Sequence, residues 1–352
     1  METFFLKPRI RFGTDALSAL DCWKGKRALV VTDGFFVTSR LIERVTGRLS
    51  PEQVTVFDRV EPDPSLQLVA EGAALLRQKK PEVVIALGGG SAMDCAKAIR
   101  YFGSEGEKQV PLLCVPTTAG SGSEATAFAV LTDTEKGVKR PLVDESLLPE
   151  EALLDGAFLA GIPAGVTADT GMDVLSHALE AYVARGANPF TAAMSSEAFR
   201  MALEALPRAA EGEAEAKGRM LYASCLAGIA FNGAGLGLCH AFSHVLGGRV
   251  HMPHGRLNAL LLPLVVRWNG EDGQTAEKYA ALCHQAGIPG TVRALAARLT
   301  RLRGQLKLPD RLPEPVDCLA AAQAALEDRC AGQNPRHMTA EEGALLLREV
   351  CP

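Results

Sequence analysis

The sequence has no excess of charge of either sign and no long apolar run. Its 352 residues carry 37 Lys and Arg against 41 Asp and Glu, a formal net charge of -4. A chain whose charges are so nearly balanced has no excess of positive charge that would attract nucleic acid or an anionic membrane. No apolar run approaches the roughly 18 residues that a transmembrane helix needs. The start, METFFLKPRIRFG, lacks the basic and then apolar segments of a signal peptide. We therefore expect a cytoplasmic protein that binds neither nucleic acid nor membrane.

Regularly spaced cysteines are also missing. The nine cysteines are scattered and include no CxxC pair. An odd count without regular spacing argues against a disulfide framework and fits a reducing compartment. Cys239 adjoins a histidine, but neighbouring positions of a helix point about 100° apart. Cys239 is therefore expected to be a small, buried apolar residue rather than a metal ligand or a nucleophile.

The sequence shows no internal repeat and no low-complexity segment, and its length suits two domains of ordinary size. Its first half alternates β-branched apolar runs with helical patterns, which predicts a parallel sheet with right-handed crossovers. The expected strands are 27–32, 53–57, 83–87 and 112–115, with helical stretches such as 65–79 between them. Parallel sheets of this kind bind ligands at the carboxyl ends of their strands.

Three loops follow these strands. The first contains Asp33, a residue type that accepts hydrogen bonds from ribose hydroxyls and repels a 2′-phosphate, which favours NAD over NADP. An ordinary turn or helix N-cap is the alternative for Asp33. The second loop is Gly88, Gly89, Gly90 and Ser91, where the backbone can approach a phosphate at the N-terminus of the next helix. This loop is neither a GxGxxG fingerprint nor a Walker A loop, and a tight strand-to-helix turn is its alternative.

Two charged residues lie early in the helix that follows the glycine loop. Asp94 is placed to reach a ligand above the loop, and for Lys97 a position on a solvated face is the alternative to a role at the loop. The third loop, PTTAGSGSE, carries Thr117, Thr118 and Ser121. So many hydroxyl and glycine residues make a loop that cradles a polar ligand with its own donors. A flexible linker is the alternative, but the position at a strand end and the β-like run AFAVLTD that follows count against it.

The pattern changes near residue 160. Beyond a stretch rich in Gly and Pro, almost every segment has the period of an amphipathic helix. The expected helices include 173–183, 195–206, 216–231, 276–286 and 340–350, and 304–315 is expected to be a surface loop. We therefore place an α/β dinucleotide-binding domain at 1–160 and an all-helical domain for metal and substrate at 161–352. Because the nucleotide loops and the histidines described next fall in different domains, we expect the reacting centre between the domains.

Four of the seven histidines crowd into the stretch GLGLCHAFSHVLGGRVHMPHG. His240 and His244 are spaced i, i+4 and share one face of a predicted helix. Gly247-Gly248 is expected to end that helix, which leaves His251 and His254 on a turn. An earlier helix carries Asp173 and His177, again i, i+4. One Asp and up to three His form a ligand set for a divalent transition metal. Isolated core or surface histidines are the alternative.

Four phrases together resemble the iron-dependent alcohol dehydrogenase family: GGGSAMDCAKAI, PTTAGSGSEAT, TGMDVLSHALEAY and the histidine stretch up to PHG. The resemblance runs over essentially the whole chain. It implies a Rossmann-like parallel-sheet domain followed by an all-helical metal-binding domain, an architecture shared with dehydroquinate synthase. The phrases EPDPS, GGRVHMPHG and NPR are similar to the 1-propanol dehydrogenases of propanediol-utilisation microcompartments.

The resemblance implies a role for each candidate residue. The metal ligands would be Asp173, His177, His240 and His254. His244 would be catalytic, on the substrate side near the nicotinamide. His251 agrees with the propanol-type enzymes and is a substrate-pocket candidate, with a solvated loop histidine as its alternative. The residues that match the family's NAD(H)-binding positions are Asp33, Gly88, Gly89, Gly90, Ser91, Asp94, Thr117, Thr118, Ser121 and Lys139.

The expected reaction is the interconversion of short-chain aldehydes and primary alcohols, such as propanal and 1-propanol or acetaldehyde and ethanol. Fe²⁺ would act as a Lewis acid and NAD(H) as hydride carrier. Zn²⁺ or another divalent metal also suits imidazole and carboxylate ligands. The alternative substrate pair is lactaldehyde and 1,2-propanediol. A dehydroquinate synthase-like lyase and a nucleotide-binding protein without activity are the competing functions. The lyase needs basic residues for a phosphorylated substrate and uses an acid with two histidines, whereas this chain offers an Asp and three histidines in an apolar domain. An inactive protein would lack a metal ligand or a glycine-containing loop, and none is missing.

Partners are implied by the same resemblance. It suggests a homodimer or a larger homo-oligomer. The likeness to microcompartment enzymes also suggests encapsulation in a shell, together with a coenzyme A-dependent aldehyde dehydrogenase that would regenerate NAD. No amphipathic extension precedes the first expected strand, so a terminal targeting peptide is not visible.

Overall fold

The computed structural model describes residues 3–104, 109–136 and 138–352. The chain divides into two compact units, Met1–Gly161 and Ile162–Pro352. The boundary between the units lies one residue from the position where the sequence pattern changes. Each unit has its own type of secondary structure.

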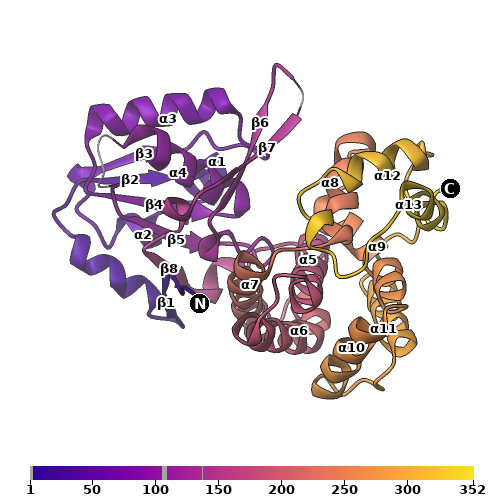
Figure 1. Ribbon diagram of the computed structural model, residues 1–352. Coiled ribbons are helices and arrows are strands. Elements are labelled where there is room, and N and C mark those ends of the chain that lie inside the picture. The colour runs from indigo at the N-terminus through magenta and orange to yellow at the C-terminus, as the bar shows by residue number, and fades with distance from the viewer. Residues whose placement is uncertain (1–2, 105–108, 137) are drawn as a thin grey trace. The chain divides into compact units, whose positions relative to one another are not determined.

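The first unit is built on a six-stranded sheet in the order β1-β8-β5-β4-β2-β3, and every described pair in it is parallel. Figure 1 shows this sheet between its helices. A separate antiparallel hairpin pairs β6 with β7. The strands are β1 (Arg9–Phe12), β2 (Ala28–Val31), β3 (Val54–Phe57), β4 (Val83–Gly88), β5 (Leu112–Pro116), β6 (Phe128–Asp133), β7 (Val138–Val143) and β8 (Glu151–Leu154).

The central strands follow from their composition. Every residue of β2, β4 and β5 is buried, and unbroken β-branched or aliphatic runs are typical of parallel strands covered on both faces. The four strands expected from the sequence are confirmed. The expectation omitted β1 and β8, because β1 (RIRF) is a mostly exposed edge strand with two arginines and β8 (EALL) is only four residues long.

Helices cover this sheet. The Ser65 hydroxyl accepts from the Leu68 amide, 3.1 Å away, and so caps the N-terminus of α3. Helix α4 packs on β4 and β5, and α3 packs on α4 (Figure 1). A buried cluster that includes Val84, Met93 and Ile99 fills the space between sheet and helices. The helices are α1 (Gly34–Thr38), α2 (Glu43–Thr46), α3 (Leu66–Lys79) and α4 (Gly90–Gly103), with a 3-10 helix at Ala16–Trp23.

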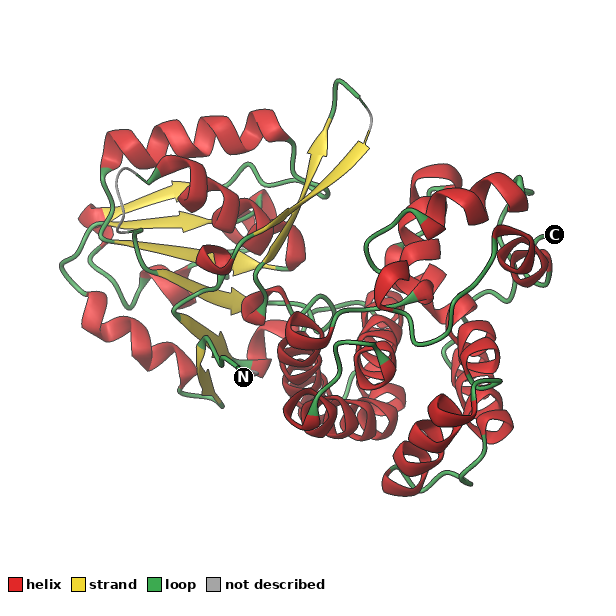
Figure 2. Ribbon diagram, viewed as in Figure 1, coloured by secondary structure: helices red, strands yellow, loops and turns green. Residues whose placement is uncertain are grey.

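Every secondary-structure element that the structure describes in the second unit is a helix, with loops between them, as Figure 2 shows by colour. Its longest pair, α6 and α7, pack against each other and against α5. The helices are α5 (Ala164–Val183), α6 (Pro189–Ala210), α7 (Ala214–Ala234), α8 (Leu238–Val250), α9 (His254–Asn269), α10 (Gly273–Gln285), α11 (Val292–Gln305), α12 (Cys318–Leu326) and α13 (Ala340–Arg348). The expected fold class, an α/β domain followed by an all-helical one, is confirmed.

One expectation about the histidine stretch is wrong. Gly247-Gly248 does not end the helix, because α8 continues to Val250 and ends at His251, which has a left-handed φ of 49°. Leu246 and Val250 are both buried, and this packing outweighs the cost of about 1 kcal/mol that a glycine adds inside a helix. His254 is likewise not on a turn but is the first residue of α9, directly after Pro253.

Among the described residues, no single helix is long and apolar enough to cross a membrane, while one bent pair, α7 with α8, meets that test by length and composition alone.

Candidate functional site

Three candidate histidine ligands converge on one carboxylate oxygen of the fourth candidate, Asp173, in the second unit. Oδ1 of Asp173 lies 3.7 Å from Nε2 of His177, 3.5 Å from Nε2 of His240 and 3.6 Å from Nε2 of His254. Asp173 and His177 come from α5, His240 from α8 and His254 from the first turn of α9. The structure therefore brings together all four residues that the sequence singled out as metal ligands.

The spacing of these atoms suits a metal ion. Ligand atoms about 2.1 Å from a tetrahedral metal lie about 3.4 Å from one another. The three distances from Asp173 Oδ1 are 3.5 to 3.7 Å. The ligand atoms of Asp173, His240 and His254 all lie within 4.8 Å of one another, a group that does not include His177. A carboxylate with three imidazoles is a donor set for Fe²⁺, Zn²⁺ or a similar divalent ion. These residues thus fit the metal expected from the sequence.

Gly255 allows the close approach of α9 to α5. A Cβ at this position would lie 2.0 Å from the carbonyl oxygen of Asp169 and 3.3 Å from Cβ of Asp173. The next residue fixes the contact, because Arg256 donates to both carboxylate oxygens of Asp169, at 3.0 and 2.9 Å. Only glycine therefore lets His254 start its helix this near to Asp173.

A second carboxylate orients His240. Oε2 of Glu180 lies 2.6 Å from Nδ1 of His240, and both side chains are buried. The other oxygen of Glu180 accepts from the Cys239 amide, 2.6 Å away, at the N-terminus of α8. Because Nδ1 is held by Glu180, Nε2 is the His240 nitrogen turned to the cluster, an arrangement common around metal-bound histidines. Glu180 is one turn from His177, so the spacing in the sequence could have identified it.

Asn258 also belongs to the cluster and was not predicted. Its amide nitrogen lies 2.7 Å from Oδ1 of Asp173 and 3.1 Å from Nε2 of His254. The amide oxygen accepts from the hydroxyl of Ser243. Asn258 lies four residues after His254 on α9, one helical turn away, so the same i, i+4 spacing that pairs Asp173 with His177 also connects Asn258 with a ligand.

The charges of the cluster are coupled. Burial opposes ionisation of Asp173, but His177, His254 and His240 outweigh it and hold the pKa of Asp173 below its ordinary value. Burial also opposes a charge on His240, but the hydrogen bonds that the protonated ring donates to Asp173 and Glu180 raise the pKa of His240 to about 9. Burial lowers the pKa of His254, which therefore stays neutral and keeps a lone pair for a metal. Metal binding must displace the His240 proton.

The two remaining histidines of the stretch differ in position. The ring of His244 stacks on that of His254 at 5.4 Å, and its side chain is 42% exposed. His244 thus lies beside the ligands but on an accessible side. His251 is exposed at the C-cap of α8 and is not part of the cluster of ligand atoms.

The two glycine-containing loops of the first unit lie against each other. A Cβ on Gly89 would meet Oγ1 of Thr118 at 3.0 Å, and one on Gly90 would meet Oγ of Ser121 at 3.0 Å. The Thr117 amide donates to the Gly88 carbonyl, 3.0 Å away. Gly89 is the N-cap of α4, and Gly90 and Ser91 are its first residues. The loops therefore form one surface of small residues at the N-terminus of a helix, a setting that suits a phosphate.

Asp94 and Lys97 are part of the packing behind these loops. Asp94 accepts from the Ser123 hydroxyl at 2.6 Å and from the Val130 amide at 2.9 Å. Lys97 is fully buried and donates to Ser123 at 2.8 Å, to Thr126 at 3.1 Å and to the Phe128 carbonyl at 2.8 Å. The alternative of a solvated face for Lys97 is therefore wrong. Three acceptors on the following segment compensate its burial, which lowers its pKa.

Asp33 and Lys139 lie at other places in the same unit. Asp33 follows β2 and caps α1, because its Oδ1 accepts a hydrogen bond from the Phe35 amide at 2.9 Å. The N-cap alternative for Asp33 is thus correct for this carboxylate oxygen. Lys139 lies on β7 and forms an exposed ion pair with Asp63, with 2.6 Å between Nζ and Oδ1.

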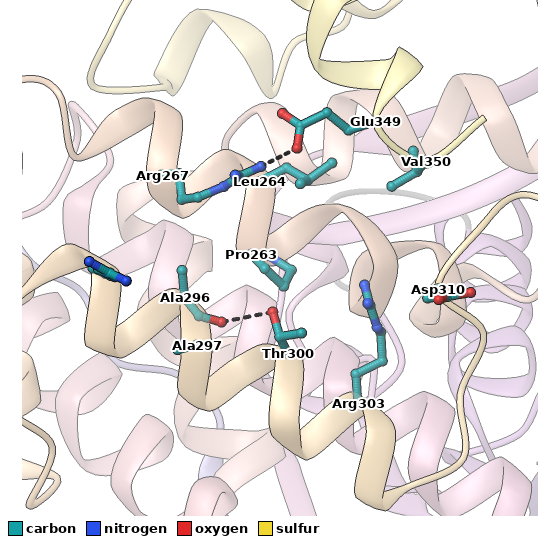
Figure 3. Close-up of a pocket in the computed structure, with 11 residues that line it drawn as sticks. Pro263, Leu264, Arg267, Ala296, Ala297, Thr300, Arg303, Asp310, Glu349 and Val350 are labelled. Atoms are coloured by element: carbon teal, nitrogen blue, oxygen red, sulfur yellow. Dashed lines mark hydrogen bonds and ion pairs between the residues drawn. The ribbon is translucent and has the colours of Figure 1, made fainter. Parts of the chain in front are cut away.

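A surface pocket of about 390 Å³ lies elsewhere in the second unit (Figure 3), between α9, α11 and the C-terminal segment. Arg267, one of three arginines that line the pocket, forms an ion pair with Glu349. None of its lining residues belongs to the histidine cluster, so the pocket adds nothing to that site.

Comparisons with known proteins decide the family. The model of "Iron-containing alcohol dehydrogenase" matches residues 7–156, and the model of the "Fe-containing alcohol dehydrogenase family, C-terminal" matches residues 167–351. The chain belongs to the iron-containing alcohol dehydrogenase family. The chain is therefore an oxidoreductase of the iron-containing type.

Full-length relatives support this assignment. The chain is 38% identical to the 1-propanol dehydrogenase PduQ of Salmonella typhimurium, over 99% of this chain and 100% of that protein. It is 36% identical to the NAD-dependent methanol dehydrogenase of Bacillus methanolicus, over 99% and 100% of the two chains. Among solved structures, a 1,3-propanediol oxidoreductase superposes with a TM-score of 0.94 at 34% identity, over 99% and 100% of the two chains. The sulfoacetaldehyde reductase of Bifidobacterium kashiwanohense, solved with NAD⁺, gives 0.91 at 28% identity, over 99% and 98%.

Proposed function

We propose that this alcohol dehydrogenase interconverts short-chain aldehydes and primary alcohols, with propanal and 1-propanol or acetaldehyde and ethanol as its substrates. The observation that carries the proposal is the convergence of three histidines on Oδ1 of Asp173, with His244 exposed beside them. The full-length similarity to a 1-propanol dehydrogenase supports the substrate class.

The roles of the residues follow from their positions. Asp173, His177, His240 and His254 hold the metal, and Glu180 fixes the ring of His240. In the 1–160 domain, the backbone and hydroxyls of the two loops bind the cofactor's phosphates, and the helix N-terminus behind them favours the negative charge. The proposed cofactor residues are Asp33, Gly88, Gly89, Gly90, Ser91, Asp94, Thr117, Thr118, Ser121 and Lys139.

When bound, iron supplies Lewis acidity toward the substrate oxygen and NAD(H) supplies the hydride. The chain must supply the proton that accompanies the hydride. His244 is the candidate, since its side chain is accessible and its ring stacks on that of His254. In the direction of reduction His244 gives a proton toward the new hydroxyl group, and in the direction of oxidation it takes one up. His251, exposed three residues before His254, is proposed as a substrate contact.

A second substrate class is lactaldehyde and 1,2-propanediol. It is supported by the similarity to a 1,3-propanediol oxidoreductase, which is named for a small diol. The two classes differ by one hydroxyl group, and a site built to hydrogen-bond that group rejects the analogue that lacks it. The test is a comparison of kcat/KM for propanal, acetaldehyde and lactaldehyde with NADH and iron-loaded protein. A preference for propanal and acetaldehyde supports the first class, and a preference for lactaldehyde replaces it with the second.

We also propose a homo-oligomer, a dimer or larger, that works with a coenzyme A-dependent aldehyde dehydrogenase in the cytoplasm or inside a microcompartment shell. The chain is 36% identical to part of the bifunctional aldehyde-alcohol dehydrogenase AdhE of Escherichia coli, over 92% of this chain and 43% of that protein. That fusion supports the coupling of the two activities. Fractionation of purified shells tests encapsulation, because an enzyme found only outside the shells would refute it.

A further inference from the structure

His244 is held by a carboxylate from a distant part of the chain. Its Nδ1 lies 2.9 Å from Oδ2 of Asp328. His244 is on α8, while Asp328 lies in the turn that follows α12, 84 residues later in the sequence. No pattern in the sequence connects the two residues, and the contact exists only because α12 packs on α8.

The Asp328 carboxylate is itself fixed. Its Oδ1 accepts from the Cys330 amide at 2.8 Å, so the turn holds one oxygen and leaves Oδ2 to the imidazole. Burial opposes the charge of Asp328, but His244 and the amide and thiol of Cys330 outweigh it and keep the pKa of Asp328 below its ordinary value. Asp328 is thus a fixed, ionised acceptor.

An ionised carboxylate only accepts hydrogen bonds, so Nδ1 of His244 must carry the hydrogen. In the neutral ring this leaves the lone pair on Nε2, the nitrogen that Asp328 does not occupy. Resting on the role proposed above for His244, we propose that Asp328 is a positioning residue that holds His244 in one tautomer and one orientation for proton transfer through Nε2.

The same three side chains allow another interpretation. His244, Asp328 and Cys330 offer ligand atoms within 4.8 Å of one another, which is close enough for a metal ion. Burial raises the pKa of the Cys330 thiol, with Asp328 adding to the effect, which disfavours the thiolate that a metal binds. The 2.9 Å between Nδ1 of His244 and Oδ2 of Asp328 is the length of a hydrogen bond, so the observations favour the hydrogen-bonded pair. The metal content of a variant separates the two interpretations.

The first experiment is a double-mutant cycle on the iron-loaded enzyme. Asp328→Asn keeps the side chain's shape but removes the charge that selects the tautomer. We expect it to lower kcat with propanal and NADH by about 10²-fold, with a smaller change in KM. In a His244→Ala background the same substitution should change kcat by less than about twofold, because Asp328 acts through His244. Asp328→Glu should recover part of the lost turnover.

Asp317→Asn is the matched control. Asp317 caps α12 from the solvent side by accepting from the Leu319 and Ala320 amides, both at 3.1 Å. Asparagine caps a helix as well as aspartate, so this variant should keep full turnover. All variants should bind as much metal as the unchanged protein. A loss of bound metal in Asp328→Asn would overturn the proposal and place Asp328 among metal ligands.

The second experiment does not depend on turnover. In protein loaded with diamagnetic Zn²⁺ and labelled with ¹⁵N at its seven histidines, NMR shifts report which nitrogen carries the hydrogen. The His244 signals, identified by their absence from His244→Ala, should show hydrogen on Nδ1 in the unchanged protein and a mixture in Asp328→Asn. An unchanged tautomer in Asp328→Asn would contradict the proposal even if the enzyme proved inactive toward every aldehyde. Conversely, a tautomer shift without aldehyde reduction would refute the proposed function alone.

Discussion

The imidazole of His240 lies between two carboxylates, with Nδ1 at 2.6 Å from Oε2 of Glu180. Its other nitrogen lies 3.5 Å from Oδ1 of Asp173. Since both Glu180 and His240 are buried, neither side chain can turn to solvent. Glu180 therefore determines which nitrogen of His240 is presented to the metal.

Substitution of Glu180 tests this relationship. Glu180→Gln keeps an oxygen for the Cys239 amide but loses the charge that holds His240. We expect metal affinity to fall by about 10 to 100-fold, the usual effect of removing such a partner. Competition with a chelator of known affinity measures it. Glu197→Gln is the control, because Glu197 only forms a half-exposed ion pair with Arg200 on α6. Equal affinities in the two variants would contradict the role given to Glu180.

The stability of the metal-free protein should depend on pH through His240. An unfolded histidine loses its proton near pH 6.5, whereas the folded, metal-free protein holds the pKa of His240 at about 9. Between these values the native state binds more protons, so its unfolding free energy should fall as pH rises. Urea unfolding across this range measures the slope. The slope should flatten in Glu180→Gln, and a slope that is identical in both proteins would refute the assignment to His240.

Asp33 should select between the two nicotinamide cofactors. Asp33→Asn keeps the cap on α1, since asparagine also accepts from the Phe35 amide, but it removes the charge that repels a 2′-phosphate. We expect the ratio of kcat/KM for NADPH to that for NADH to rise about tenfold, which corresponds to about 1.4 kcal/mol.

Asp144→Asn serves as the control for Asp33. Asp144 is another capping aspartate in the same unit and accepts from the Ser146 amide at 2.9 Å. Its substitution should leave the cofactor ratio unchanged. If Asp33→Asn also leaves the ratio unchanged, Asp33 is a helix cap and nothing more.

Periodic features of the structure could be predicted from the sequence. The buried strands β2 and β4 are unbroken apolar runs, and the ligand pair Asp173 and His177 shows the spacing of one helical turn. The end of α8 could not be predicted, because the tertiary packing of Leu246 and Val250 stabilises the helix despite the low helix propensity of two glycines. The burial of Lys97 could not be predicted for the same kind of reason, since its three acceptors lie 26 to 31 residues further along the chain.

The site residues divide in the same way. Glu180 and Asn258 lie on the ligand-bearing helices at helical spacing from His177 and His254, so the sequence pattern contains a signal for both. Asp328 had no such signal, because it reaches His244 from a turn 84 residues away. Long-range contacts of this kind depend on the packing of whole helices, which no local pattern records.

The absorbance of NADH after propanal is added to the protein tests the proposed metal-dependent alcohol dehydrogenase reaction. With Fe²⁺ bound, we expect NADH to be oxidised at a rate proportional to the enzyme concentration, a chelator to abolish the reaction, and added Fe²⁺ to restore it. The proposed reaction is wrong if folded, iron-loaded protein binds NADH but leaves it unoxidised with propanal, acetaldehyde and lactaldehyde, or if it oxidises NADH equally well after chelation.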